Sequence, residues 1–173
     1  MKIEFGFAFS KNKFPFNIFA LLINWLQKID ASHTFMAYYG ETGSKRYYDA
    51  TFWKVKSLPK YKFLKSYDIR RTYYFTIPEE RRIEILKWME SNEGRGYSMG
   101  QIFGLLIKIL GFSKKSIWRG NPTNVICNEI LVLFIRDVMG VKISKNENDY
   151  DLDETQALLD DLVSRGLLYR GEI

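Results

Sequence analysis

The sequence contains one cysteine, Cys127, and one histidine, His33, among its 173 residues. A single cysteine excludes an intrachain disulfide and every zinc site that needs several cysteines. With a single histidine as well, a mixed His/Cys metal centre is also excluded. The carboxylates form neither an EF-hand loop nor a paired-aspartate motif. We therefore expect no metal and no other cofactor.

Long hydrophobic runs are also absent. The main apolar segments, 16–25 and 102–112, are each about a dozen residues long, whereas a membrane-spanning helix needs about twenty. We expect buried or interfacial helices at both places and no transmembrane segment. From Met1 the chain passes directly into an alternating apolar pattern over residues 3–9, without the cleavage site of a secretory signal. This start predicts a cytoplasmic protein at synthesis, and it is compatible with a phage-encoded or bacterial source.

Acidic residues are outnumbered by basic ones. The chain has 26 Lys and Arg against 20 Asp and Glu, a net charge of +6 and a pI of about 9.3. Such a surface favours phosphate backbones, anionic lipids or acidic polymers without choosing among them. Basic and aromatic residues interleave at 45–48 (Lys-Arg-Tyr-Tyr) and 70–74 (Arg-Arg-Thr-Tyr-Tyr), a pattern that can stack on bases and contact phosphates. A basic, non-enzymatic nucleic-acid-binding domain is therefore one alternative for this protein.

The order of predicted elements favours one α+β domain over residues 1–173. Alternating apolar residues predict strands in the first half, at about 2–9, 33–39, 46–56 and 71–77. Helical spacing and capping signals predict helices at about 17–29, 79–91, 98–110, 124–138 and 153–164. Strands followed by helices indicate a small antiparallel sheet packed against several helices, rather than a parallel doubly wound sheet.

Cys127 lies at the start of a predicted helix. A thiol attacks as thiolate, and a helix N-terminus or a histidine lowers its pKa. Thr123 or Asn124 can cap this helix, which places Cys127 within its first turn, where the free N–H groups favour a negative charge and can bind an oxyanion. The alternative is that Cys127 only fills space in a core with Ile126 and Ile130, because free cysteines are usually buried.

His33 begins the predicted strand 33–39, and the next strand carries Asp49. A hairpin that turns at residues 40–44 brings Asp49 near the level of His33. A catalytic histidine needs a third group to fix its tautomer, and aspartate is uncommon in mid-strand, which favours a purpose for Asp49. Glu41 is the weaker candidate, since a carboxylate in a turn is usually solvated.

Taken in order, five segments resemble a circularly permuted papain-like cysteine peptidase or amidase, of the group related to the NlpC-type cell-wall peptidases. They are the His-led strand 32–38 (Ser-His-Thr-Phe-Met-Ala-Tyr), the acid-Ala segment 48–50 (Tyr-Asp-Ala), 96–98 (Gly-Tyr-Ser), the nucleophile segment 126–131 (Ile-Cys-Asn-Glu-Ile-Leu) and 151–155 (Asp-Leu-Asp-Glu-Thr). The resemblance covers about residues 30–160. It implies a permuted papain-like fold.

The resemblance also implies roles for individual residues. Cys127 corresponds to the nucleophile, His33 to the base, Asp49 to the orienting acid and Tyr97 to a polar group near the oxyanion or the substrate. The chain departs from the family at two positions. Asn128 stands where serine is usual, and Asp49 stands where glutamate or another polar residue is common.

The implied activity is acyl transfer through a thioester. The protein would then be a thiol peptidase, amidase or acyltransferase acting on an amide bond, in a peptide, in peptidoglycan or in an acyl-amide. A papain-like domain that has lost catalysis and only binds is a further alternative, beside the nucleic-acid-binding domain described above.

Overall fold

The computed structural model describes residues 1–11, 21, 25, 29–40, 43–50, 54–113 and 124–171. Its main feature is a six-stranded sheet in the order β4-β3-β2-β1-β5-β8, in which every neighbouring pair is antiparallel. The strands are β1 (Lys2–Ser10), β2 (His33–Tyr39), β3 (Lys45–Ala50), β4 (Val55–Pro59), β5 (Tyr67–Thr76) and β8 (Tyr169–Arg170). The predicted α+β class with an antiparallel sheet is confirmed.

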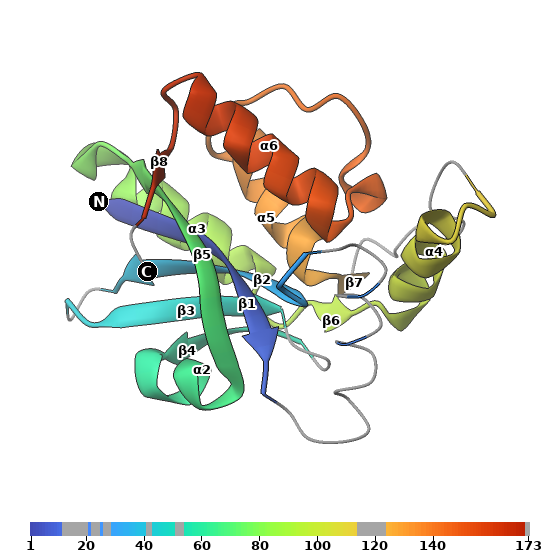
Figure 1. Cartoon of the computed structure of the whole chain (residues 1–173). Helices are drawn as coiled ribbons and strands as arrows, with labels where there is room; N and C mark the ends of the chain where they lie inside the picture. Colours follow the sequence, from blue (N-terminus) through green and yellow to red (C-terminus); the bar gives the residue numbers. More distant parts are fainter. Residues whose placement is uncertain are drawn as a thin grey trace.

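Helices follow and flank this sheet (Figure 1). They are α2 (Lys60–Ser66), the 3-10 turn η1 (Glu79–Arg81), α3 (Arg82–Asn92), α4 (Met99–Ile109), α5 (Cys127–Asp137), the 3-10 turn η2 (Glu147–Asp149) and α6 (Leu152–Ser164). A short parallel pair, β6 (Gly96–Tyr97) with β7 (Asn124–Val125), joins the start of α4 to the start of α5.

The two faces of the sheet enter different cores because side chains alternate along each strand. Ile3, Phe5 and Phe7 of β1 face the larger core, which α3, α5 and α6 complete. The Phe5 ring meets the Phe134 ring of α5 edge-on at 5.5 Å. The opposite face packs against α2, where the Phe63 ring lies 4.3 Å from the Tyr47 ring. Figure 1 shows α5 and α6 on one side of the sheet and α2 on the other.

Several predicted boundaries are wrong. The single strand predicted at 46–56 is two strands, β3 and β4, which pair antiparallel through Ala50 and Val55. The strand predicted at 71–77 begins earlier, at Tyr67, and α2 before it was not predicted. The helix predicted from residue 79 opens as a 3-10 turn. Most of the helix predicted at 17–29 lies outside the described residues.

Candidate active site

Cys127 is the first residue of α5. Ile126 is the N-cap, with extended backbone angles, and its N–H donates to Glu129 Oε2 at 3.3 Å. The predicted cap is wrong: Asn124 lies in β7, and Thr123 lies outside the described residues. The consequence for the thiol is the one expected, because the N–H groups of the first helical turn have no acceptor inside the helix and favour a negative charge.

His33 and Asp49 form a buried pair on neighbouring strands. His33 Nε2 lies 2.5 Å from Asp49 Oδ1, and the exposed fractions of the two residues are 5% and 0%. The register of β2 on β3 sets Met36 opposite Tyr48. Asp49, the next residue of β3, therefore lies closer to the end of β2 that carries His33. The predicted hairpin therefore brings this histidine and this carboxylate together. The other candidate acid, Glu41, lies outside the described residues.

Tyr67 holds the imidazole plane. Its ring is stacked on the ring of His33, with centroids 4.6 Å apart and planes 14° apart. The Tyr67 ring also stacks on the ring of Phe63, with the two centroids 4.8 Å apart. Because Asp49 occupies Nε2, Nδ1 is the ring nitrogen of His33 left to exchange a proton with a nucleophile.

The pKa values of the thiol and the imidazole move in opposite directions. Burial raises the pKa of Cys127, but the charge and hydrogen bond of His33, with the backbone N–H of Thr34, bring it below its usual value. Burial lowers the pKa of His33, but Tyr67, Asp49 and Cys127 raise it well above its usual value. Opposite shifts favour a thiolate beside an imidazolium, the reactive form of a catalytic cysteine.

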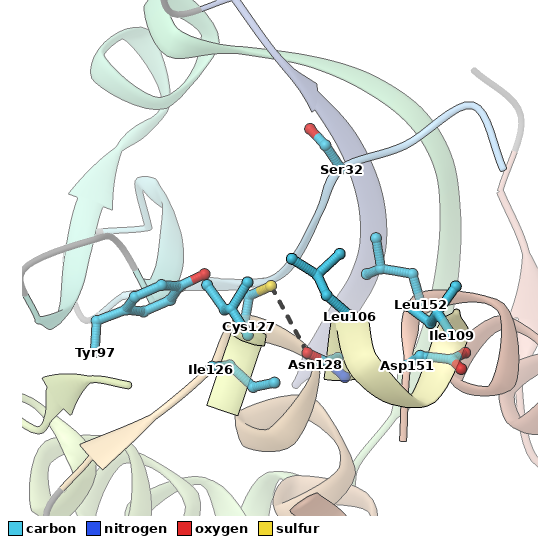
Figure 2. Close-up of a pocket in the computed structure, with 10 residues that line it drawn as sticks. Ser32, Tyr97, Leu106, Ile109, Ile126, Cys127, Asn128, Asp151 and Leu152 are labelled. Atoms are coloured by element: carbon cyan, nitrogen blue, oxygen red, sulfur yellow. Dashed lines mark hydrogen bonds between the residues drawn. The ribbon is translucent and has the colours of Figure 1, made fainter. Parts of the chain in front are cut away.

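Tyr97 lies beside the thiol. Its backbone in β6 pairs with Val125 in β7, and the N–H of Ser98 donates to the carbonyl of Val125 at 3.2 Å. Figure 2 shows the Tyr97 hydroxyl turned toward the sulfur of Cys127. Burial, followed by the charge of Cys127, raises the pKa of Tyr97 well above its usual value, so this phenol stays protonated and able to donate. All four residues of the predicted site are thus brought together.

Asn128 follows the cysteine and supports the same turn. Its Oδ1 lies 4.0 Å from Cys127 Sγ, the contact drawn as a dashed line in Figure 2, and its Nδ2 donates to the carbonyl of Tyr150. Tyr67 and Thr34 are the site residues that sequence reasoning missed. Thr34 had a signal, since it follows His33 on the same strand. Tyr67 had no such signal, because it reaches the site only through the position of α2, which the sequence did not predict.

A pocket opens next to the thiol. Its cavity volume is about 40 Å³, or about 420 Å³ with the space that opens toward solvent. Cys127 and Ile126 border it at one end, and Ile102, Leu106, Ile109 and Leu152 supply most of the rest. Figure 2 shows Leu106 beside Cys127, with Ile109 and Leu152 farther along. Cys127 is therefore part of the pocket lining, although only 6% of its surface is exposed.

Most rings of the basic and aromatic segments are buried, and the half-buried ring of Tyr74 is covered by Lys2. Tyr47, Tyr48 and Tyr73 have exposed fractions of 2% or less, so that their rings are part of the cores. The neighbouring cations have protein partners: Lys45 binds Glu4 at 2.6 Å, and Arg71 binds Asp30 at 3.0 Å. Bases need accessible rings to stack on. This arrangement disfavours the nucleic-acid-binding alternative.

Comparison with protein-family models gives no match, and neither does comparison with curated protein sequences. Among the described residues, no three His, Cys, Asp or Glu side chains are grouped so that they could hold a metal ion. Within the same part of the chain, no helix has the length and hydropathy needed to cross a membrane.

Proposed function

We propose that this protein is a cysteine-dependent hydrolase or acyltransferase that cleaves an amide or related acyl bond through Cys127, His33 and Asp49. The observation that carries the proposal is the 2.5 Å contact between buried His33 and Asp49, next to a thiol at a helix start whose pKa His33 lowers. A lone cysteine that only filled a core would need no oriented imidazole beside it. The site supplies all three parts that nucleophilic catalysis requires: a thiol, a base and a group that orients the base.

The reaction follows from these positions. With its proton already on His33 Nδ1, the thiolate of Cys127 bonds through Sγ to the substrate carbonyl carbon. The N–H groups at the start of α5 stabilise the oxyanion. As the intermediate collapses, the bond to the leaving amine or alcohol breaks and His33 returns the proton to it. Water, or another acceptor activated by His33, then releases the thioester and restores the thiol.

The fold supports the same proposal at a coarser level. In papain-like enzymes the nucleophile opens a helix that packs on an antiparallel sheet carrying the base, and in this protein Cys127 opens α5 while His33 begins β2 of the antiparallel sheet. Here the histidine precedes the cysteine in the chain, which is the order of the permuted group named above. We therefore extend the proposal to a permuted papain-like architecture, with a peptide, a cell-wall peptide or an acyl-amide as the substrate class.

Trapping the thioester tests the proposal. The protein is mixed with an activated acyl ester, p-nitrophenyl acetate, quenched in acid and analysed by mass spectrometry. We expect acetyl addition on the peptide that contains Cys127, a burst of p-nitrophenol and no addition in Cys127→Ala. His33→Ala should reduce the burst rate by roughly two to four orders of magnitude, which is the usual contribution of a general base to the rate.

Two outcomes would favour the alternatives. If the protein is folded but Cys127 is not acylated, Cys127 is a core cysteine and the protein is a binding module. Strongly salt-dependent binding to single-stranded nucleic acid, lost when Arg70 and Arg71 are replaced by glutamine, would identify a nucleic-acid-binding domain.

A further inference from the structure

We propose that a polar cavity at the edge of the sheet, where β8 pairs with β5 below α6, binds the phosphate group of a small phosphate monoester (Figure 1). The volume of this cavity is about 300 Å³, and none of the residues that line it lines the pocket beside Cys127. The inference is therefore independent of the proposed function and is tested without it.

The lining of this cavity is polar. β5 contributes Arg71, Thr72 and Tyr73, α6 contributes Gln156 and Asp160, and the end of the described chain contributes Arg170 and Gly171. Among these lining residues there is no aliphatic side chain, so the cavity offers little to a hydrocarbon group. Two guanidinium groups, one carboxylate and one amide favour a charged ligand that forms hydrogen bonds.

Two arginines border the cavity from neighbouring strands. Arg170 of β8 lies directly opposite Tyr73 of β5, and Arg71 precedes Tyr73 by two residues. Residues two apart on a strand share a face, and both Arg71 and Tyr73 form hydrogen bonds to α6. Arg71 and Arg170 are therefore diagonal neighbours on that face, a relation in which residues are about 7–8 Å apart. Two guanidinium groups at this spacing can donate to opposite sides of one phosphate.

Helix α6 holds both guanidinium groups in place. Gln156 Oε1 accepts a hydrogen bond from Arg71 Nη1. One turn later, Asp160 Oδ1 accepts one from Arg170 Nη2 at 2.9 Å, and the same oxygen accepts the hydroxyl of Tyr73 at 2.9 Å. Arginine side chains that are already oriented lose less conformational entropy when a ligand binds. The cavity is preorganised for an anion.

Both arginines keep donors for a ligand. A guanidinium group has five N–H groups. Among the described residues, Arg170 donates to Asp160, and Arg71 donates to Gln156 and Asp30. The lining carries two positive charges and one negative charge, since Asp30 is not part of it. A cavity with net positive charge and spare N–H donors attracts an anion.

A phosphate monoester matches this cavity in charge and size. Near pH 7 the group carries a charge of about −1.5 to −2 and offers three acceptor oxygens, enough for both arginines. A carboxylate has one charge and two oxygens, which a single arginine satisfies. A phosphate fills only part of the 300 Å³, which leaves room for a small polar substituent such as glycerol. Tyr73 is only 2% exposed, so its ring is not accessible to a nucleobase.

An NMR titration of the isotope-labelled intact chain tests the inference, with inorganic phosphate and glycerol 3-phosphate as probes. We expect saturable shifts at the amides of Thr72 and Gly171, with a Kd of about 1 mM or below for glycerol 3-phosphate. Arg170→Gln should weaken binding roughly ten- to a hundredfold, because it removes charge-assisted hydrogen bonds. Asp160→Asn keeps the acceptor oxygen, removes the opposing negative charge and should tighten binding by roughly threefold.

Arg165→Gln is the matched control. Arg165 pairs with Asp161 at 3.3 Å outside the cavity, and its replacement changes the net charge of the protein by the same amount as Arg170→Gln. Binding in this control should stay within about twofold of wild type. Equal weakening by the two variants would reveal an unspecific attraction of phosphate to a basic surface and would overturn the inference. The absence of saturable shifts at both amides, with either probe, would overturn it too.

Two further probes identify the source of the phosphate. Phosphatidic acid in phosphatidylcholine vesicles carries the same monoester group at a membrane surface. Binding to it or to glycerol 3-phosphate that needs Arg170 supports the site, and the probe that binds at the lower phosphate concentration gives the source. A single-stranded oligonucleotide without a terminal phosphate offers only diesters. If it binds more tightly than glycerol 3-phosphate and loses this binding in Arg170→Gln, the cavity belongs to a nucleic-acid surface and the inference is overturned.

Discussion

His33 Nε2 and Asp49 Oδ1 lie 2.5 Å apart, inside the protein, on neighbouring antiparallel strands. The second oxygen, Oδ2, has no hydrogen-bond partner among the described residues. Burial of an ion pair is costly unless the partners are well oriented. A buried carboxylate that contacts the one histidine of the chain is best explained by its effect on the orientation and the pKa of that histidine.

Asp49→Asn removes this charge and keeps the size of the side chain. We expect the pKa of His33 to fall, because burial then acts with less opposition, and the rate of acylation to fall by roughly two to four orders of magnitude. His33 is the only histidine, so its titration is followed as a single imidazole signal by NMR. An unchanged His33 pKa in the variant would show that Asp49 does not orient the base.

The same pair affects stability as a function of pH. Because the folded-state pKa of His33 is raised, the imidazolium stabilises the fold fully below the unfolded-state pKa of about 6.5. That contribution is lost as the pH rises through the folded-state value. The stability difference between wild type and Asp49→Asn should therefore be larger in mildly acidic than in alkaline solution, as measured by urea unfolding.

Tyr67 gives a third prediction, which concerns the position of the imidazole. Tyr67→Phe keeps the rings stacked on His33 and Phe63 and removes only the hydroxyl, which helps to raise the pKa of His33. The alkylation midpoint of Cys127 should therefore rise only slightly. Tyr67→Ala removes the ring and should lower the free energy of unfolding by about 3–5 kcal/mol. At a pH where the protein is folded, it should also slow alkylation of Cys127. A destabilised variant with an unchanged pH profile would reduce Tyr67 to a packing residue.

The histidine–aspartate pair could be predicted from the sequence because it depends on local structure. A strand, a five-residue turn and a second strand fix which residues approach one another, and His33 and Asp49 are both within that hairpin. The position of Cys127 at a helix start is equally local. The helical spacing and the polar residues before the helix placed its start correctly, near Cys127, although the N-cap residue is Ile126.

Other parts of the site depend on contacts between distant segments, and these could not be predicted. Tyr67 reaches His33 because α2, a lysine-rich segment with one buried residue, Phe63, turns the chain before β5. Its periodicity was too weak to show a helix. The pocket likewise requires that α4 lie across the start of α5, an arrangement set by the short pairing of β6 with β7.

Glu129 gives a fourth prediction, because it connects α4 with α5. Its Oε2 accepts the N–H of Ile126 at 3.3 Å and the side-chain amide of Gln101 at 2.9 Å, in a buried position. Glu129→Ala removes the acceptor of both donors and should cost about 1–3 kcal/mol of stability in urea unfolding. The exposed Glu80→Ala serves as a control and should change stability by less than about 0.5 kcal/mol.

In Glu129→Ala, alkylation of Cys127 should also slow, because α5 begins at this cysteine. Wild-type alkylation in a variant that has lost stability would mean that Glu129 supports the helices without placing the thiol.

The central claim is that His33 activates Cys127. The most direct measurement is the rate of iodoacetamide alkylation of the native protein as a function of pH, with Cys127→Ala as the blank. We predict a midpoint below the ordinary thiol pKa of about 8.5 in wild type. In His33→Ala the midpoint should move above that value, because burial then acts without the imidazolium. Alkylation that occurs only after unfolding, or a midpoint that His33→Ala leaves in place, would contradict the account.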